Sequence, residues 1–189
     1  MNQADPARMP TTRTNARPSE TSCPGVNEPA SVQLNKFFEP AAYDAIVDAL
    51  DRVKSTSSVI ADRYSRNEAK LPAPVAKLFT SEKFRSFVKR VTGVDPGMKA
   101  RLELYGHRDF TLRQDDEKPP GLFVYFDMTD DWLEGTGGET IVTDEEGELV
   151  RVSPSANTLV LIDCRKAYPF VRYVNHRAGE RIIARIVWY

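Results

Sequence analysis

The sequence predicts a mainly β protein of the α+β class, a β-sandwich or barrel preceded by two helices. From residue 98 onward the segments are short, rich in Val, Ile, Thr and aromatic residues, and separated by turn residues. Seven or eight such segments fall within about ninety residues, which is typical of a sandwich or barrel. Two amphipathic helical patterns come before them, so we expect helices to cover one face of a sheet.

Two segments have the apolar periodicity of a helix. Residues 40–53 place one set of apolar side chains on a single helical face, and residues 80–93 place a second set on another. Each face is expected to pack against the β-sheet. The two sets are Ile46, Ala49, Leu50 and Val53 in the first helix, and Phe84, Phe87, Val88 and Val91 in the second.

Residues at the ends of the second helical pattern suit helix termini. Thr80 or Ser81 is expected to cap its first turn, because a hydroxyl oxygen accepts from a backbone N–H group there. Gly93 is expected to end it, since glycine adopts positive φ without strain. Pro72 and Pro74 are predicted to leave only a short connection between the two helices.

The strands are predicted from short runs bounded by turn residues. The sequences DEEG (144–147) and HRAGE (176–180) are predicted to be hairpin turns. The expected strands lie near 99–105, 109–114, 121–127, 138–143, 148–153, 157–162, 169–175 and 181–188.

The chain is expected to hold one folded domain, residues 31–189, behind a tail. Residues 1–30 contain five of the thirteen prolines and no aromatic residue. Such a composition buries too little apolar surface to offset the entropy of ordering, so we expect a disordered tail. No repeat and no second domain is apparent.

The composition excludes some partners and locations. The formal net charge is −1, so no excess of positive charge indicates binding to nucleic acid or to a membrane surface. Two cysteines, Cys23 and Cys164, are too few for a disulfide framework and favour a reducing cytoplasm. No apolar run is long enough to span a bilayer. The expectation is a cytoplasmic protein whose partner is a small molecule.

The two histidines of the chain permit one metal site. His107-Arg108-Asp109 is an H-x-D motif, and His176 is a distant third candidate. Two histidines and a carboxylate on a β-barrel form the facial triad of non-haem iron oxygenases. The alternative is a histidine–carboxylate hydrogen bond that joins two strands.

Several motifs occur in an order that resembles a known enzyme family. LNKFFEPAAYDAIVDAL, SEKFRSFVKRVTG, LYGHRDFTLRQDDE, WLEGTGGETIV, GELVRVSPSANTLVLID and ERIIARIVWY follow one another between residues 33 and 189. In this order they resemble the 2-oxoglutarate/Fe(II)-dependent oxygenases of the prolyl-4-hydroxylase-like group. The resemblance implies a double-stranded β-helix, a jelly-roll or cupin-like fold, with two N-terminal helices packed on one sheet. It implies Fe(II) and 2-oxoglutarate as cofactors.

The same resemblance indicates where iron ligands belong, and two of the three ligands, both of them imidazoles, are missing. Counted from Tyr105, the first ligand position falls at Gln114 and the carboxylate ligand at Asp116. The distal histidine position falls at Val171 if the cosubstrate-binding arginine is Arg181. Glutamine is a weak oxygen donor and valine has no donor, so the metal centre is predicted to be degenerate.

His107, Asp109 and His176 form an alternative metal set in the same fold. The second and seventh strands of such a barrel are antiparallel neighbours, so the numbers of paired residues have a constant sum. The pair 109 and 176 has the same sum as the pair 114 and 171. Asp109 and His176 are therefore predicted to face each other, about 17 Å from the usual metal end at about 3.4 Å per residue. A structural pair is favoured over a metal site.

Arginines on the last strand are the candidates for binding a ligand carboxylate. Arg181 is the first choice and Arg185 the second, because both share one face of the strand opposite Ile182, Ala184, Ile186 and Trp188. The family's tryptophan lies six residues after its basic residue, whereas Trp188 lies seven after Arg181. The family topology adds pocket candidates on neighbouring strands: Tyr105, Thr140, Tyr125 and Arg113.

Three functions remain open at this point. The first is an oxygenase-family enzyme that acts on a small amino-acid-like or metabolite substrate, with an unusual iron site. The second is a metal-free descendant that binds a carboxylate ligand, or catalyses a non-redox step through Asp116, Gln114 and the arginines. The third is a non-catalytic interaction module.

Overall fold

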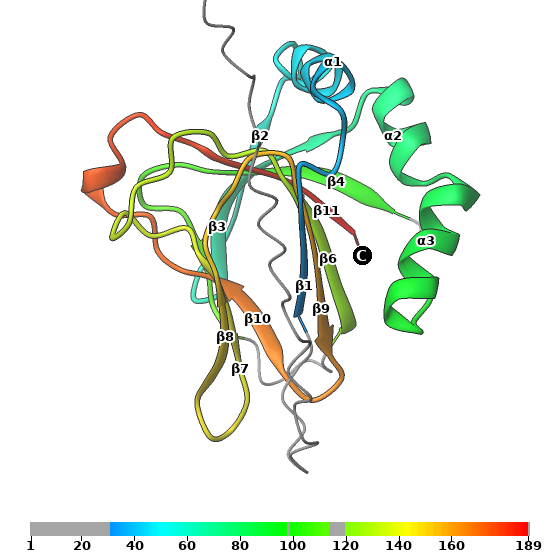
Figure 1. Cartoon of the computed structure of the whole chain (residues 1–189). Coiled ribbons are helices and arrows are strands. Elements are labelled where there is room, and N and C mark those ends of the chain that lie inside the picture. Colours follow the sequence, from blue (N-terminus) through cyan, green and yellow to red (C-terminus); the bar gives the residue numbers. More distant parts are fainter. Residues whose placement is uncertain (1–30, 98, 114–119, 189) are drawn as a thin grey trace, which may run out of the picture.

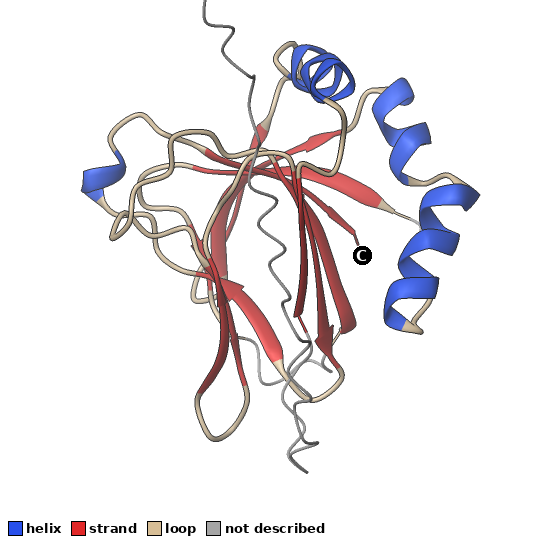
Figure 2. Cartoon of the chain, viewed as in Figure 1, coloured by secondary structure: helices blue, strands red, loops and turns tan. Residues whose placement is uncertain are grey.

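The computed structural model describes residues 31–97, 99–113 and 120–188, and these form three helices, one 3₁₀ turn and eleven strands. Figure 1 shows the whole arrangement and Figure 2 its helices and strands. In chain order the elements are β1 (Ser31–Asn35), α1 (Pro40–Leu50), β2 (Thr56–Ile60), β3 (Tyr64–Lys70), α2 (Ala73–Phe79), α3 (Glu82–Thr92), β4 (Ala100–Tyr105), β5 (Phe110–Thr111), β6 (Gly121–Asp127), β7 (Thr140–Thr143), β8 (Glu148–Val152), β9 (Thr158–Cys164), β10 (Tyr168–Val171), η1 (His176–Ala178) and β11 (Ile183–Trp188).

Two antiparallel sheets face each other across an apolar interior (Figure 2). The large sheet has the order β1-β9-β6-β11-β4-β3-β2, with β5 paired to β3, and the small sheet has the order β10-β7-β8. Tyr125 and Val160 of the large sheet belong to one buried cluster with Val142 and Val152 of the small sheet. The predicted mainly β fold with facing antiparallel sheets is therefore confirmed at this level.

The helices cover the outer face of the large sheet, as Figure 1 shows for α2 and α3. Phe84 and Val88 of α3 are buried with Phe126 and Trp188 of the sheet, and α1 contributes Ile46 and Leu50 to the same cluster. The residues at the centre of each predicted apolar face are thus buried as predicted. Val91, at the end of α3, is exposed instead.

A third helix occurs where a short connection was predicted, which corrects the expectation of two helices. Residues 73–79 form α2, with Pro72 at the N-cap and Pro74 inside the first turn. The first turn of a helix tolerates proline because the N–H groups there have no partner within the helix. Val75 and Phe79 of α2 are buried in the same core as α3.

The predicted strands of the second half are present, with shifts of one to four residues at their ends. The DEEG turn is a hairpin between β7 and β8. The HRAGE segment is not a hairpin, because η1 connects β10 of the small sheet to β11 of the large sheet. The strands β1, β2 and β3 were not predicted. In the described ranges no helix has the length and apolar character needed to cross a membrane.

Candidate functional site

Charged side chains form a row across the inner face of the large sheet. Alternate residues of a strand point to opposite faces, so the residues that alternate with the helix-facing leucines and phenylalanines point between the two sheets. Arg185 on β11 pairs with Asp127 on β6 and with Glu103 on β4, and Glu103 pairs with Glu68 on β3. The interior of the barrel therefore contains one arginine and three carboxylates at one level of the large sheet.

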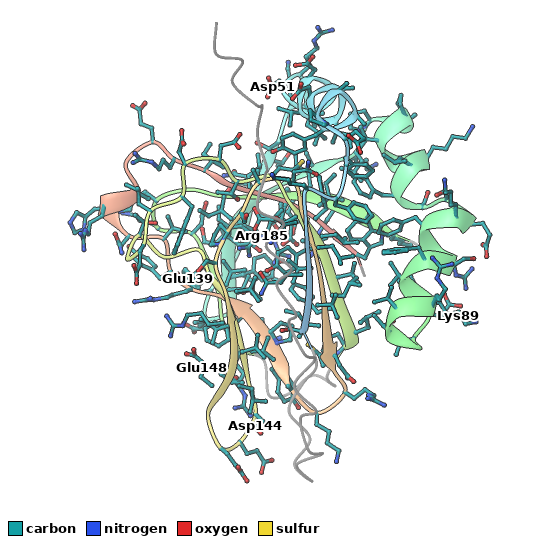
Figure 3. All side chains as sticks on the ribbon, in the orientation of Figure 1. Asp51, Lys89, Glu139, Asp144, Glu148 and Arg185 are labelled. Atoms are coloured by element: carbon teal, nitrogen blue, oxygen red, sulfur yellow. The ribbon has the colours of Figure 1, made fainter. Side chains whose placement is uncertain are left out.

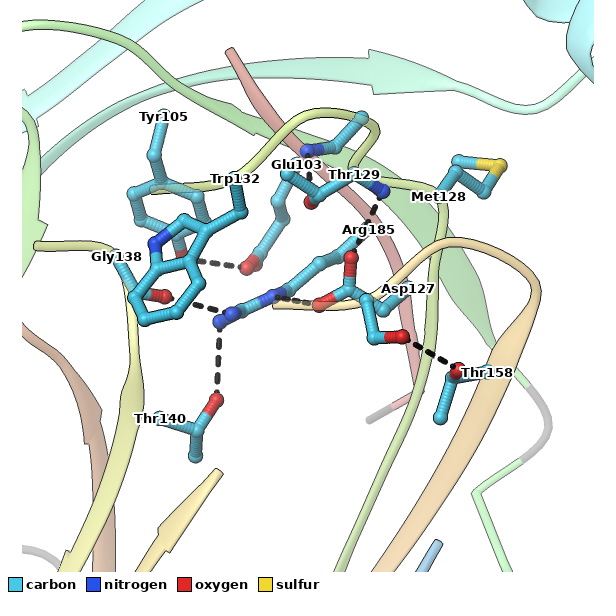
Figure 4. A network of polar contacts seen from close by, with 12 residues as sticks. Glu103, Tyr105, Asp127, Met128, Thr129, Trp132, Gly138, Thr140, Thr158 and Arg185 are labelled. Atoms are coloured by element: carbon cyan, nitrogen blue, oxygen red, sulfur yellow. Dashed lines mark hydrogen bonds and ion pairs between the residues drawn. The ribbon is translucent and has the colours of Figure 1, made fainter. Parts of the chain in front are cut away.

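Arg185 and Asp127 form the deepest contact of this row (Figure 4). Arg185 Nε lies 3.1 Å from Asp127 Oδ2, and both side chains are 1% exposed. Arg185 Nη1 donates to Thr140 Oγ1 at 3.0 Å and Nη2 donates to the Gly138 carbonyl at 2.7 Å. Every nitrogen of the guanidinium group thus has an acceptor within the protein.

The surroundings of the ion pair hold it in place. The guanidinium carbon lies 4.7 Å from the centre of the Tyr125 ring, which is a cation–π contact. Asp127 Oδ1 accepts from the Thr129 backbone N–H at 2.9 Å. Figure 3 places Arg185 in the middle of the molecule, between the two sheets. The pair is charge-balanced and fully hydrogen-bonded, which is the arrangement that a buried charge requires.

The two glycines of the GGET sequence lie where neighbouring segments leave no room for a side chain. Gly137 and Gly138 have φ of 88° and 85°, a region that side chains disfavour. A Cβ atom on Gly137 would collide with the Tyr173 carbonyl, and one on Gly138 with the Ile183 side chain. The two glycines thus let the backbone come close enough for the Gly138 carbonyl to meet Arg185.

A second polar cluster surrounds Glu103 at the end of the row. Tyr105 donates its hydroxyl to Glu103 Oε2 at 2.7 Å, and Arg101 Nε donates to Glu103 Oε1 at 2.8 Å. Arg66 Nε lies 3.5 Å from the same Oε1 and 2.7 Å from Glu68 Oε1. The Glu103 side chain is 5% exposed, whereas that of Arg101 is 28% exposed. This cluster was not predicted, although the alternation in ARLELY places Arg101, Glu103 and Tyr105 on one face.

The Glu103 cluster borders a cavity of about 670 Å³. Charged groups on one wall belong to Arg66, Arg101 and Glu103, and aromatic rings on β6 and β10 line the rest, including Phe123, Tyr168 and Phe170. A cavity of this size, mostly apolar with a few converging polar groups, has the character of a small-molecule site. Arg185 and Asp127 lie behind this wall and are not part of the lining.

Burial raises the pKa of three side chains in this region, two tyrosines and one aspartate. Burial raises the pKa of Tyr125 to about 12, although Arg185 partly opposes this shift. The pKa of Tyr105 is raised well above its usual value, first by burial and next by the negative charge of Glu103. Burial also raises the pKa of Asp127, against the lowering effect of Arg185. Both tyrosines therefore keep their protons near neutral pH, and Tyr105 is a hydrogen-bond donor to Glu103.

The structure reverses the order of the two candidate arginines. Arg181 precedes β11, is exposed, and donates from Nη1 to the Ala178 carbonyl at 3.4 Å. Arg185 is the inward-facing arginine and lies with two other predicted pocket residues, Tyr105 and Thr140, in the network of Figure 4. Trp188 lies on the opposite face, stacked on Phe84 with ring centres 4.9 Å apart. The predicted division of the last strand into two faces holds for residues 184–188, whereas Arg181 and Ile182 precede the strand and are exposed.

The alternative metal set is not assembled. Asp109 Oδ1 accepts from Ser65 Oγ at 2.6 Å and Oδ2 from the Gly106 N–H at 2.9 Å. The backbone of Asp109 pairs with Val174 and not with His176, so the observed register differs from the predicted one. His107 and His176 are both exposed. Within residues 31–97, 99–113 and 120–188, no three His, Cys, Asp or Glu side chains cluster in a way that would hold a metal ion.

The ligand positions implied by the resemblance are only partly described. Gln114 and Asp116 lie outside the described residues. Val171 is buried in an apolar cluster with Tyr105, Val174 and Ile183, and its backbone N–H donates to Thr111 Oγ1 at 2.6 Å. A buried valine offers no donor atom to iron.

The described residues do not fit the two cofactors that the resemblance implies. In the register that takes Arg181 as the cosubstrate arginine, iron would need an imidazole where Val171 supplies a hydrocarbon side chain. A 2-oxoglutarate carboxylate would need an accessible arginine with uncompensated charge, whereas Arg185 is 1% exposed, is paired with Asp127, and donates from each of its three nitrogens within the protein. Arg181 lies outside the barrel interior.

Comparison with known proteins identifies solved structures that share the fold. No protein-family model and no curated protein matches the chain. A Pseudomonas putida prolyl-4-hydroxylase superposes with a TM-score of 0.62 at 14% identity, over 84% of this chain and 90% of the other. A 2OG-Fe(II) oxygenase family oxidoreductase from Burkholderia pseudomallei gives 0.65 at 14%, over 84% and 83%. A Trichoplax adhaerens prolyl hydroxylase in complex with a hypoxia inducible factor peptide gives 0.64 at 14%, over 84% and 82%. The chain shares the fold of these 2-oxoglutarate oxygenases.

Proposed function

We propose that this chain is a metal-free descendant of the 2-oxoglutarate oxygenases that binds a small amino-acid-like carboxylate ligand in the cavity beside Glu103. The observation that carries the proposal is the Asp127–Arg185 pair, with both side chains 1% exposed. The arginine that faces the barrel interior is neutralised by the protein's own carboxylate. A ligand carboxylate is therefore expected to bind elsewhere in the barrel.

The wall of the cavity suits a ligand with charges of both signs. Arg66 and Arg101 offer guanidinium groups to a carboxylate, and the partly exposed Arg101 is the more accessible of the two. Glu103, which lines the cavity and shares Arg66 and Arg101 with Glu68, offers a carboxylate to an ammonium group. The aromatic rings on β6 and β10 offer an apolar surface to a side chain. An α-amino acid or a similar zwitterion combines these three features.

The charges of the Glu103 cluster cancel one another before a ligand binds, and this affects which ligands are preferred. Arg66, Arg101, Glu68 and Glu103 carry no net charge together and are linked by ion pairs of 2.7–3.7 Å. A zwitterion exchanges these contacts for equivalent ones, whereas a simple anion leaves one carboxylate of the cluster uncompensated. Amino acids are thus expected to bind better than their deaminated analogues.

A ligand screen tests this function. Proteinogenic amino acids and small carboxylates are compared for their effect on the melting temperature, and any stabilising compound is titrated by calorimetry. Arg101→Met and Glu103→Gln are each expected to weaken binding about tenfold, because each removes a charge-assisted hydrogen bond. Arg165→Met is the matched control, since its side chain is 73% exposed and pairs only with its neighbour Asp163 among the described residues.

Two results would overturn the proposal. One is that no amino acid or carboxylate stabilises the wild-type chain. The other is that the ligand binds equally well to wild type, Arg101→Met and Glu103→Gln.

A further inference from the structure

The strand β2 (Thr56–Ile60) ends the large sheet and is open on its outer side. It pairs with β3 and, in the described part of the chain, with no other strand. Its sequence TSSVI contains no charge and no proline, and Val59 and Ile60 are 63% and 47% exposed. Natural edge strands usually carry a lysine, a proline or a bulge that prevents pairing with another chain. β2 has none of these features within its length.

The direction of the free backbone groups follows from the hairpin. The Ile60 carbonyl accepts from the Arg63 N–H at 3.1 Å, so it points towards β3. Thr56 and Ser58 point the same way, because the N–H and C=O groups of alternate residues in a strand share one side. Ser57 and Val59 therefore direct their N–H and C=O groups away from the sheet, where a further strand would pair.

We propose that β2 pairs antiparallel with β2 of a second copy of this chain, around a two-fold axis at Ser58. In this register Ser57 of each copy faces Val59 of the other, and the two pairs exchange four backbone hydrogen bonds. The two large sheets become one continuous sheet. The contact is isologous, which is the usual geometry of a homodimer.

Charge complementarity selects a second copy and this register. Centring the pairing on Ser58 brings Lys54, which precedes β2, towards Asp62 in the β2–β3 turn of the other copy, at both ends of the strand pair. Both residues are exposed. The uncharged strand lies between the two ionic contacts, so the edge is complementary to itself. Since the contact is short compared with a standard interface, we expect a weak, concentration-dependent dimer.

Disulfide trapping tests the register. Facing residues of a non-hydrogen-bonded antiparallel pair have Cα atoms about 4.5 Å apart, within the range that a disulfide bridges. Ser58→Cys in a Cys23→Ser background is therefore expected to form a covalent dimer on mild oxidation. Thr56→Cys in the same background is the matched control. Its two copies would lie about 14 Å apart at about 3.4 Å per residue, so it should not cross-link.

Charge reversal tests the same contact without cysteines. Lys54→Asp is expected to shift the dimer towards monomer in sedimentation velocity, and Lys54→Asp with Asp62→Lys is expected to restore it. Lys166→Asp serves as a control at a site away from β2. A wild-type chain that stays monomeric at every concentration would overturn the proposal, as would equal cross-linking at residues 56 and 58. This inference is independent of the proposed ligand site.

Discussion

Arg185 is the residue on which the functional interpretation depends. It lies on the inner face of β11, where the resemblance implies a cosubstrate-binding arginine, yet Asp127 supplies the carboxylate that it binds. Thr140 and Tyr125, both predicted to line the pocket, complete its surroundings. The three nitrogens of Arg185 thus all donate to groups within the protein.

Removing the charge of Asp127 tests this role. Asp127→Asn keeps the shape of the side chain but leaves Arg185 buried without a counter-charge, so we expect the free energy of unfolding to fall by about 3–5 kcal/mol. The double variant Asp127→Leu with Arg185→Met is expected to recover most of this loss, because it replaces the ion pair by apolar contacts. Urea unfolding measures both. A loss below about 1 kcal/mol for Asp127→Asn would show that the pair is not tightly buried.

Part of this site could be predicted from the sequence, and the rest could not, for physical reasons. Alternation on the last strand correctly put Arg185 on a face with Arg181, but periodicity does not tell where a strand begins. Arg181 lies before the first residue of β11, and is therefore outside the barrel. The role of Asp127 was not predicted, because its partner lies 58 residues away in sequence. Long-range pairing of this kind depends on strand order, which local sequence does not specify.

At the scale of elements, α3 shows how local signals determine a helix. Ser81 accepts from the Phe84 N–H at 3.2 Å, and Gly93 ends the helix with φ of 73°. Between these caps, Phe84 and Val88 are buried against the sheet. The predicted boundaries 80–93 and the observed boundaries agree within two residues for this reason.

The cap of α3 permits a controlled stability measurement. Ser81→Ala removes the acceptor for a backbone N–H group of the first turn, and we expect a loss of about 1 kcal/mol in the free energy of unfolding. Ser86→Ala is the control, because Ser86 is exposed in the middle of the same helix and alanine has the higher helix propensity. Thermal unfolding that shows equal effects at both positions would contradict the assigned cap.

Elements without a local signal were not predicted. β2 and β3 are rich in Ser and other polar residues, and the pairing of β2 with β3 and of β3 with β4 stabilises them more than their own composition does. Tertiary packing overrides weak strand propensity in such cases. The helix α2 was missed because its prolines were interpreted as breaking residues, whereas they lie at the one part of a helix where proline is accepted.

For the whole molecule, the apolar core under the helices is largely separate from the charged row inside the barrel. The core between the helices and the large sheet consists of apolar clusters such as Phe79, Phe84, Phe126 and Trp188. Phe79, Phe84 and Phe126 do not line the cavity, so the charged row can vary without loss of this part of the core. The solved structures that share the fold at 14% identity are consistent with this separation of core and site.

The most direct test of the account is the binding of 2-oxoglutarate. The purified chain is titrated with 2-oxoglutarate by calorimetry in anaerobic buffer, with and without Fe(II). The account predicts no heat of binding and no iron-dependent affinity, because Arg185 is held by Asp127 and Val171 cannot ligate a metal. Iron-dependent binding at micromolar concentration, followed by conversion of 2-oxoglutarate to succinate in air, would contradict it and would establish an oxygenase.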